Sequence, residues 1–288
     1  MKLRTKNALT GFFLTLPLLL GCLVFYGFAF ALVIWFSLVK GSGASAEFAG
    51  LYHYTQLLQN PVFRLAMKNT FGFLAVGLCL ILTLSYAIAL LLRDPVRRSK
   101  LLQTVVMLPY VMPVVGAIVL IDVLFGEMGL WSKLYAFLGL PVADWLQSEH
   151  AFWITVGLYL WKNTGYSVLI LLSGLVTIPK EQYESAQLDG ASRTQQFYHI
   201  TVPQMWYSVF FAGVFSLINA FKCFREIFLI GGEAPAESLY MLQHFINNCF
   251  QKLSYGKMAA TSMVITAVLA LAFGICYRLV MGKEAFRG

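Results

Sequence analysis

The chain has 288 residues, of which 59% are hydrophobic and only 12% are charged, and its formal net charge is +8. Together with a mean hydropathy of +0.73, this composition excludes a soluble globular domain, because too few polar side chains are present to cover its surface. The long, continuous apolar runs also exclude an outer-membrane β-barrel, whose strands alternate between apolar and polar residues. The sequence therefore indicates an integral membrane protein built from helices.

Six apolar runs are long enough to cross a bilayer, which takes roughly 20 residues of helix. In chain order they cover residues 12–38, 70–92, 105–125, 152–178, 206–230 and 258–281. The first run follows Lys2, Arg4 and Lys6 and could be mistaken for a signal peptide, with Ala29–Ala31 as a cleavage site. It continues well past the length of a signal core, so we interpret it as a retained first transmembrane helix.

The distribution of Lys and Arg predicts the orientation, because cytoplasmic loops near the spans collect these residues. With six spans, twelve of the 21 basic residues fall on the side of the N-terminus, six fall on the opposite side, and three lie within spans. Both termini are therefore expected in the cytoplasm. The positive charge needs no nucleic acid partner, since anionic lipid of the inner leaflet already attracts such loops.

Cysteine, histidine and nucleotide motifs point away from metal or ATP chemistry in this chain. The five cysteines and four histidines are dispersed, with no CxxC and no spacing typical of a metal site. No G-x-x-x-x-G-K-[ST] sequence occurs, so the chain has no loop of this kind to cradle ATP phosphates. We therefore expect no cofactor and no metal in this chain.

A polar stretch between the fourth and fifth spans, "YESAQLDGASRTQQFYHITVP" at 183–203, contrasts with the apolar runs around it. Pro179 suits a helix start, and a short helix is expected over about 179–188. Gly190 can adopt positive φ and stop that helix, while Ser192 with Gln195 resembles a capping box that starts a second one. Two short helices around a sharp turn are predicted on the cytoplasmic side, ending at about Pro203.

These residues resemble the EAA loop of binding-protein-dependent ABC importer permeases, whose usual form is E-A-A-x-x-D-G-A, then an aromatic residue and I-x-L-P. Ser185 and Val202 depart from that form, and both are small changes. The residues that match the motif positions are Glu184, Ser185, Ala186, Asp189, Gly190, Ala191, Phe197, Ile200 and Pro203. Further stretches are similar to the carbohydrate-uptake branch of the family, in the same order along residues 10–280: "FAGLYHYTQLLQNPVF", "LPYVMPVV", "GLWSKLYAFLGLPVADWL", "WKNTGYSVLILLSGLVTIPKEQYE" and "FKCFREIFLIGG".

The resemblance implies an all-α membrane protein with the type I ABC importer permease fold: a single permease domain over 1–288, with a core at 70–281 and a coupling loop at 179–203. It implies that the loop docks into a partner ATPase, with Glu184 near a basic group and Gly190 holding the turn. The implied partners are a second homologous permease, two ATPase subunits that bind ATP and Mg, an extracellular solute-binding protein and membrane lipid. The implied cargo is a sugar or oligosaccharide, and the implied location is the plasma membrane.

Charged and aromatic residues within the spans are candidates for a substrate path, since ionisable groups at membrane depth usually face a cavity or a partner. The fourth span contains Lys162 among polar neighbours, and the fifth contains Lys222 and Glu226 one turn apart. The plainer interpretation is an intrahelical pair between those two. The functional interpretation is a path that suits a sugar, lined by Trp161, Asn163, Tyr166, Asn219, Lys222, Arg225 and Glu226.

Two other classes of protein fit the sequence less well than an importer permease does. An ion-coupled secondary transporter of a small polar solute would show acidic residues at the midplane and an inverted repeat. Asp122, the one intramembrane Asp, lies near the outer end of its span, and no clear repeat is visible. A membrane enzyme would need a nucleophile, a base and an orienting group, and no such set can be assembled.

Overall fold

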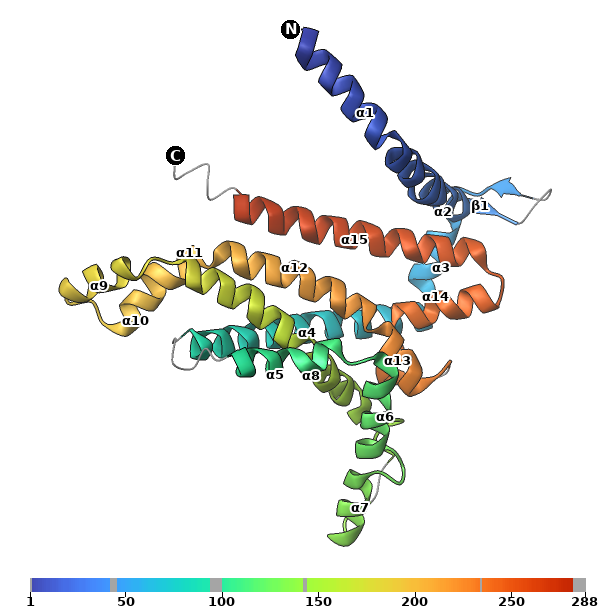
Figure 1. The fold of residues 1–288 in the computed structure, drawn as a ribbon. Helices are drawn as coiled ribbons and strands as arrows, with labels where there is room; N and C mark the ends of the chain where they lie inside the picture. The colour runs from blue at the N-terminus through green and yellow to red at the C-terminus, as the bar shows by residue number, and fades with distance from the viewer. Residues whose placement is uncertain (1, 42–45, 94–99, 142–143, 234, 282–288) are drawn as a thin grey trace. The chain divides into compact units, whose positions relative to one another are not determined.

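The computed structural model describes residues 2–41, 46–93, 100–141, 144–233 and 235–281 (Figure 1). Within these ranges the chain is almost entirely helical, as expected, apart from one pair of two-residue strands. Four of the basic residues used for the predicted orientation, Arg97, Arg98, Lys283 and Arg287, lie outside the described residues. The contacts divide the chain into two compact units, Met1–Arg64 with Phe245–Ala270 and Leu65–His244 with Leu271–Gly288.

The first unit contains the N-terminal helical run and the turn that follows it. The run consists of α1 (Lys2–Cys22), a π-helical turn η1 (Leu23–Phe28) and α2 (Ala29–Leu38), and it ends at the residue predicted for the first span. Strand β1 (Val39–Lys40) pairs antiparallel with β2 (Glu47–Phe48), with Val39 opposite Phe48. Helix α3 (Tyr52–Gln59) is held to the end of α2, since the Tyr54 hydroxyl donates to Ser37 Oγ at 2.9 Å.

Two later helices also contribute to the first unit. Helix α14 (Leu242–Gln251) supplies Phe245, whose ring centroid lies 5.5 Å from that of Phe63. Helix α15 (Tyr255–Met281) begins beside α3, and a Cβ atom added at its Gly256 would overlap the His53 imidazole. The His53 Nε2 atom in turn lies 3.0 Å from the Val39 carbonyl oxygen. Glycine at position 256 thus permits a close approach between α15 and α3.

Five helical segments in the described part of the chain are long and apolar enough to cross a membrane. They are Gly11–Leu38, Pro61–Leu92, Val114–Phe137, Trp206–Gly231 and Tyr255–Gly274. The remaining expected span, 152–178, is helix α8 (His150–Thr177), whose apolar character is interrupted by Lys162, Asn163 and Thr164. Each of these three side chains has a hydrogen-bond or ion-pair partner in the protein, which reduces the cost of placing them at membrane depth.

The second span begins earlier and the third is less regular than the apolar runs predicted. Helix α4 (Pro61–Leu92) starts nine residues before the predicted position 70, because the Asn60 side chain accepts hydrogen bonds from the Val62 and Phe63 N–H groups and Pro61 suits the first turn. The third run divides into α5 (Lys100–Val111) and α6 (Val114–Phe125). Pro113 separates them, since proline has no N–H to continue the helix.

Helix α8 is the centre of the second unit and packs along α5 and α12 (Trp206–Lys222) (Figure 1). A Cβ atom at Gly165 would overlap the Val106 carbonyl oxygen of α5, so glycine permits direct backbone contact there. On the α12 side, the Tyr159 hydroxyl donates to the Ser216 carbonyl at 2.8 Å, and Ser167 Oγ lies 3.0 Å from Ser216 Oγ. Small residues and interhelical hydrogen bonds of this kind hold helices together in lipid.

The remaining elements of the second unit lie at the two ends of α8. Helix α7 (Leu130–Phe137) lies before its start, and the short helices α9 (Lys180–Leu188) and α10 (Arg193–Gln196) follow its end (Figure 1). After α10 come the π-helical turn η3 (Phe197–Thr201) and α11 (Val202–Gln204). Beyond α12 come α13 (Phe224–Gly231) and the 3-10 turn η4 (Glu237–Leu239), whose Glu237 carbonyl accepts a hydrogen bond from the Asn69 amide of α4.

Candidate functional site

The polar stretch after α8 folds as two short helices around a glycine turn. Helix α9 ends in a Schellman motif, with the Gly190 N–H donating to the Gln187 carbonyl and the Ala191 N–H donating to the Ala186 carbonyl. Gly190 has φ +81°, where a side chain would be strained. Ser192 and Gln195 then form a complete capping box at the start of α10. The predicted turn chemistry is confirmed, and α9 begins at Lys180, one residue after the predicted Pro179.

Contacts with the end of α4 hold this loop in place. The Arg93 guanidinium lies 4.1 Å from the centroid of the Tyr183 ring, and the Tyr183 hydroxyl is 2.8 Å from Thr201 Oγ1. The Phe197 ring centroid lies 6.0 Å from that of Tyr86. Neither Arg93 nor Tyr183 was singled out from the sequence, because nothing in their spacing indicates that a residue at the end of one span meets a residue 90 positions later.

The nine residues that match the EAA motif fall into two sets. Four lie on the exposed surface of the loop: Glu184, Ser185, Asp189 and Gly190. Five are half-buried and support it: Ala186, Ala191, Phe197, Ile200 and Pro203. Phe197 packs on Tyr86 of α4, and Ile200 packs on the core between α8 and α12. Pro203 lies within α11 and does not end the helix itself, since the chain bends two residues later at Met205.

An ion pair joins the two spans that contain the charged candidates. Lys162 Nζ of α8 lies 2.7 Å from Glu226 Oε1 of α13, and the two side chains are 12% and 9% exposed. The expected intrahelical pair between Lys222 and Glu226 is therefore not formed. The Lys222–Glu226 pair does not form because Cys223 (ψ −11°) breaks the helix between the two residues. As a result Glu226 is buried, whereas Lys222 is exposed.

Trp161 lies apart from the other candidates of the fourth span. It lines a cavity of about 490 Å³ between α6 and α8, and Trp131, Trp145 and Trp153 line the same cavity. Asn163 is buried, and its amide donates to the Tyr159 carbonyl one turn earlier in α8. The structure therefore does not bring Trp161 and Asn163 to one surface.

Tyr166 belongs to a group of aromatic rings shared by three helices. It stacks on Tyr110 of α5 with ring centroids 5.4 Å apart, and Phe215 of α12 packs edge-on against it at 5.6 Å. The Tyr166 hydroxyl is buried and has no hydrogen-bond partner among the described residues. Tyr110 was not among the residues predicted to line the path, although it lies in the "LPYVMPVV" stretch.

One face of α12 and α13 remains open to the surroundings. On α12 it runs through Phe211, Phe215, Ile218 and Lys222, all exposed and spaced three or four residues apart, and on α13, beyond the break at Cys223, Arg225 and Leu229 are also exposed. Asn219 lies half-buried at its edge. Of the candidates in the fifth span, Lys222 and Arg225 are thus exposed, whereas Glu226 points to α8.

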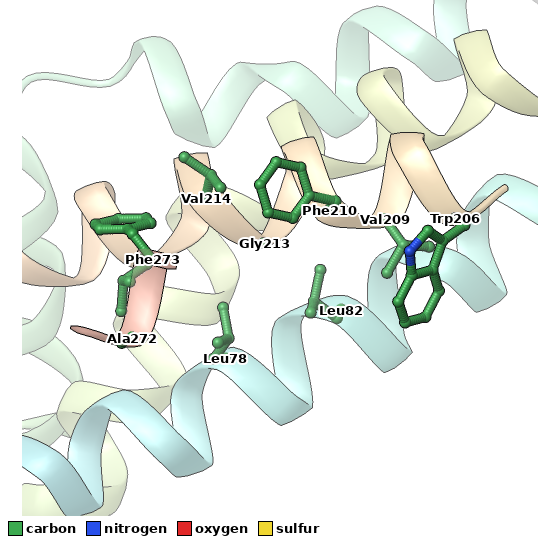
Figure 2. Close-up of a pocket in the computed structure, with 10 residues that line it drawn as sticks. Leu78, Leu82, Trp206, Val209, Phe210, Gly213, Val214, Ala272 and Phe273 are labelled. Atoms are coloured by element: carbon green, nitrogen blue, oxygen red, sulfur yellow. The ribbon is translucent and has the colours of Figure 1, made fainter. Parts of the chain in front are cut away.

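A second cavity, of about 230 Å³, lies between α4 and α12 (Figure 2). Leu78 and Leu82 of α4 face Val209, Phe210 and Val214 of α12 across it, with Trp206 at one end and Ala272 and Phe273 at the other. Its lining offers almost only carbon to an occupant. Such a surface suits a hydrocarbon chain and not a hydroxyl-rich solute, so it is not part of a sugar path.

Comparison with known proteins agrees with the motifs. Residues 81–283 match the family model described as "Binding-protein-dependent transport system inner membrane component". The trehalose/maltose transport system permease protein MalF of Thermococcus litoralis is 30% identical over 282 residues, covering 96% of this chain and 95% of that protein. The sulfoquinovosyl glycerol transport system permease protein SmoG of Agrobacterium fabrum is 30% identical over 243 residues, covering 81% and 79%.

The fold has a close match among solved structures. A chain of a bacterial alginate ABC transporter, crystallised in complex with an alginate pentasaccharide-bound periplasmic protein, superposes with a TM-score of 0.78 at 22% identity, covering 93% of this chain and 92% of that one. This confirms the predicted type I importer permease fold. The protein belongs to the family of binding-protein-dependent transport system inner membrane components, and it is a multi-pass permease subunit of an ABC importer.

Proposed function

We propose that this permease subunit imports a sugar or oligosaccharide, and that the loop at 179–203 couples its movement to ATP hydrolysis on partner subunits. The complete importer would contain a second homologous permease, two ATPase subunits that hold ATP and Mg, and an extracellular binding protein. Both termini of this chain and the loop would lie in the cytoplasm. No observation favours the ion-coupled secondary transporter now that the family is known.

The fixed geometry of the loop is the main support for its proposed coupling role. Its nine motif residues divide into an exposed set and a supporting set, and Gly190 sets the angle between α9 and α10. Contacts from Tyr183 and Phe197 tie the loop to α4, while α9 follows directly on α8. A partner that moved α9 would therefore act on two spans at once.

Support for a carbohydrate comes from the relatives and from the ring cluster. The similar permeases serve trehalose/maltose and sulfoquinovosyl glycerol systems, and the structural neighbour is an alginate transporter. In this chain Tyr110, Tyr166 and Phe215 supply aromatic faces that suit the CH patches of a sugar ring. We place the path along the open face of α12 and α13 next to this cluster, where Asn219 adds a hydrogen-bonding group.

Lys222 and Arg225 favour a second candidate cargo, an anionic sugar derivative. Both cations are exposed, Lys222 at the end of α12 and Arg225 in the first turn of α13, so a sulfonate, carboxylate or phosphate could interact with either. A neutral sugar has no group that needs two cations. Salt distinguishes the two candidate cargoes. Uptake of an anionic sugar should fall as ionic strength rises, because salt screens its attraction to the cations, whereas uptake of a neutral sugar should not depend on salt in this way.

Uptake into proteoliposomes containing the complete importer tests the proposal. Labelled maltose serves as the neutral probe and an alginate oligosaccharide as the anionic one, each with the host binding protein and internal ATP. We expect Tyr166→Ala and Asn219→Ala to reduce uptake of the transported probe at least tenfold. Trp161→Ala should have a smaller effect, since Trp161 lines a different cavity. Unchanged uptake in the Tyr166 and Asn219 variants would remove the proposed path.

A further inference from the structure

The cavity between α6 and α8 is lined by four of the six tryptophans of the chain, Trp131, Trp145, Trp153 and Trp161. Along α8 its lining extends from His150 to Trp161, a rise of about 16 Å at 1.5 Å per residue. This length is comparable to half the thickness of a hydrocarbon core, which is about 30 Å. The cavity therefore runs from the first residue of α8 to about the middle of the membrane, and we call it the tryptophan groove.

The tryptophan groove is apolar and opens to one side. Apart from the indole rings and His150 at its end, every side chain in the lining is a hydrocarbon. Trp153 is 61% exposed and Trp161 is 41% exposed, and Gly157 between them is exposed as well. A Cβ atom at Gly157 would meet nothing within 4 Å. A hydrocarbon chain can thus enter the groove directly from the bilayer.

One buried polar atom of the lining has no partner in the protein. Trp145 is 8% exposed, and its Nε1 atom is buried without a hydrogen-bond partner among the described residues. The ring is enclosed by Tyr135, with centroids 4.8 Å apart, and by His150 at 5.2 Å. An indole N–H only donates, and a buried donor without an acceptor is costly. The site therefore lacks an acceptor, which an occupant of the groove can supply.

The segment that contains Trp145 is fixed by its own hydrogen bonds. The Asp144 carboxylate accepts from two N–H groups that follow Trp145, at 3.2 and 3.1 Å. The Ser148 hydroxyl donates to the Trp145 carbonyl, and the Ser148 carbonyl accepts from Ser238 Oγ of η4. The indole donor is thus in position before an occupant binds, which lowers the entropy cost of binding.

The chemistry of the groove favours a lipid over a sugar or a protein helix. An ester carbonyl oxygen only accepts and therefore matches the indole donor, and tryptophan is common at the depth where acyl chains join the headgroup. A sugar brings many hydroxyls that also need acceptors, and indole rings provide none. A helix of another chain bonds its carbonyl groups within itself, so it would cover the groove and leave the Trp145 N–H unpaired.

We propose that the tryptophan groove binds one acyl chain of a glycerophospholipid, whose ester carbonyl oxygen accepts a hydrogen bond from Trp145 Nε1. Trp153 and Trp161 flank the acyl chain on α8, and Gly157 leaves room for it between them. The site lies in the half of α8 away from the loop at 179–203. It is also separate from the ring cluster of Tyr166, so lipid binding there does not depend on which cargo the importer carries.

The first experiment measures lipid binding to the complete importer by native mass spectrometry. The complex is purified through a tag on this chain, depleted of lipid in detergent and titrated with phosphatidylglycerol. Gly157→Leu fills the groove, Trp145→Phe removes only the N–H, and Trp35→Phe is the control, since Trp35 of α2 is an exposed indole outside the groove. Equal recovery of the complex for all variants shows that the fold is intact.

We expect Gly157→Leu to lose one tightly bound lipid relative to the wild type. Trp145→Phe should weaken the binding of that lipid about fivefold, as for the loss of one hydrogen bond. Trp35→Phe should bind like the wild type. Identical lipid occupancy in all four proteins would overturn the proposed site.

A second measurement locates the lipid in a bilayer. Proteoliposomes that contain the complete importer and a phospholipid with a diazirine in its acyl chain are irradiated, and the labelled peptides are mapped. Labelling of α6 and α8 at the groove, lost in Gly157→Leu, supports the inference. Labelling of the other spans without the groove would show that another occupant, such as a segment of the second permease, covers it. Equal labelling of wild type and Gly157→Leu would show ordinary contact with bulk lipid, and either result overturns the proposal.

Discussion

Lys162 of α8 and Glu226 of α13 form an ion pair with Nζ and Oε1 2.7 Å apart, and each side chain is about nine-tenths buried. The pair links two helices whose charged residues lie 64 positions apart in the chain. In a low-dielectric environment the loss of one partner leaves the other charge without compensation. This relationship makes the pair a structural link between α8 and α13, and it removes Glu226 from the group of side chains free to meet a solute.

Removal of either partner alone should destabilise the protein. We expect Lys162→Ala and Glu226→Ala each to cost on the order of 3 kcal/mol, because each leaves an unpaired buried charge. The double variant Lys162→Met with Glu226→Leu should recover most of the loss. The melting temperature of each variant in detergent tests this prediction. Single variants that melt at the same temperature as the wild type would show that the ion pair does not stabilise the protein.

Gly165 should not tolerate even one additional methyl group. A Cβ atom there would overlap the Val106 carbonyl oxygen, and backbone of α5 cannot move aside without separating the helices. We expect Gly165→Ala to lower stability by about 1–3 kcal/mol. Gly157→Ala is the matched control in the same helix, since a Cβ atom there meets nothing within 4 Å. Similar melting temperatures for the two variants would contradict the close packing.

Gly190→Pro should abolish transport while the protein still inserts and remains folded. Proline requires negative φ, whereas Gly190 has φ +81°, and it would also remove the N–H that donates to Gln187. ATP-driven uptake and membrane content are the two measurements. Gly139→Pro imposes the same change at a positive-φ glycine after α7, at the other end of α8, and should leave coupling unaffected. Normal uptake by a well-expressed Gly190→Pro protein would remove the coupling assignment.

His244 of α14 should make stability depend on mild acid. The imidazole is fully buried among Phe224, Phe228 and Tyr240, its Nδ1 accepts a hydrogen bond from the Met241 N–H, and burial lowers its pKa from 6.5 to about 4. Because the folded pKa is the lower one, the unfolded chain binds the proton first. The stabilisation is fully present above about pH 6.5 and is lost as the pH falls toward 4.

The measurement for His244 is the melting temperature of the wild type and of His244→Phe across that pH range. Carboxylates elsewhere also titrate below pH 5, so the informative quantity is the difference between the two proteins. We expect the wild type to lose more stability than the variant between pH 6.5 and pH 4. Parallel curves for the two proteins would show that His244 is already free to take up a proton in the folded state.

Local chemistry allowed much of the loop to be predicted from sequence. Gly190, Ser192 and Gln195 act within a few residues of one another, so their turn and capping box can be inferred without knowledge of the rest of the fold. The start of α4 could also have been predicted, because Asn60-Pro61 is a usual helix beginning that the hydropathy pattern obscured.

Tertiary pairing could not be predicted in the same way. Lys162 meets Glu226, and Arg93 meets Tyr183, only because separate helices are brought together. The helix break at Cys223 decided the partner of Glu226, and no proline or glycine marks that position. Trp161 and Tyr166 lie five residues apart on α8 and therefore on different sides of it, but which neighbour each side meets, the α6 cavity or Tyr110 of α5, depends on how the helices pack.

The contact between Arg93 and Tyr183 also limits the independent motions available to the second unit. Since α9 follows α8 directly and Tyr183 binds the end of α4, a displacement of α9 reaches α4 without first passing along the length of α8. The ends of these two helices on the side of the loop are therefore linked through this contact. A displacement of α9 would therefore act on the ends of both helices, as long as the Arg93 guanidinium stays on the Tyr183 ring.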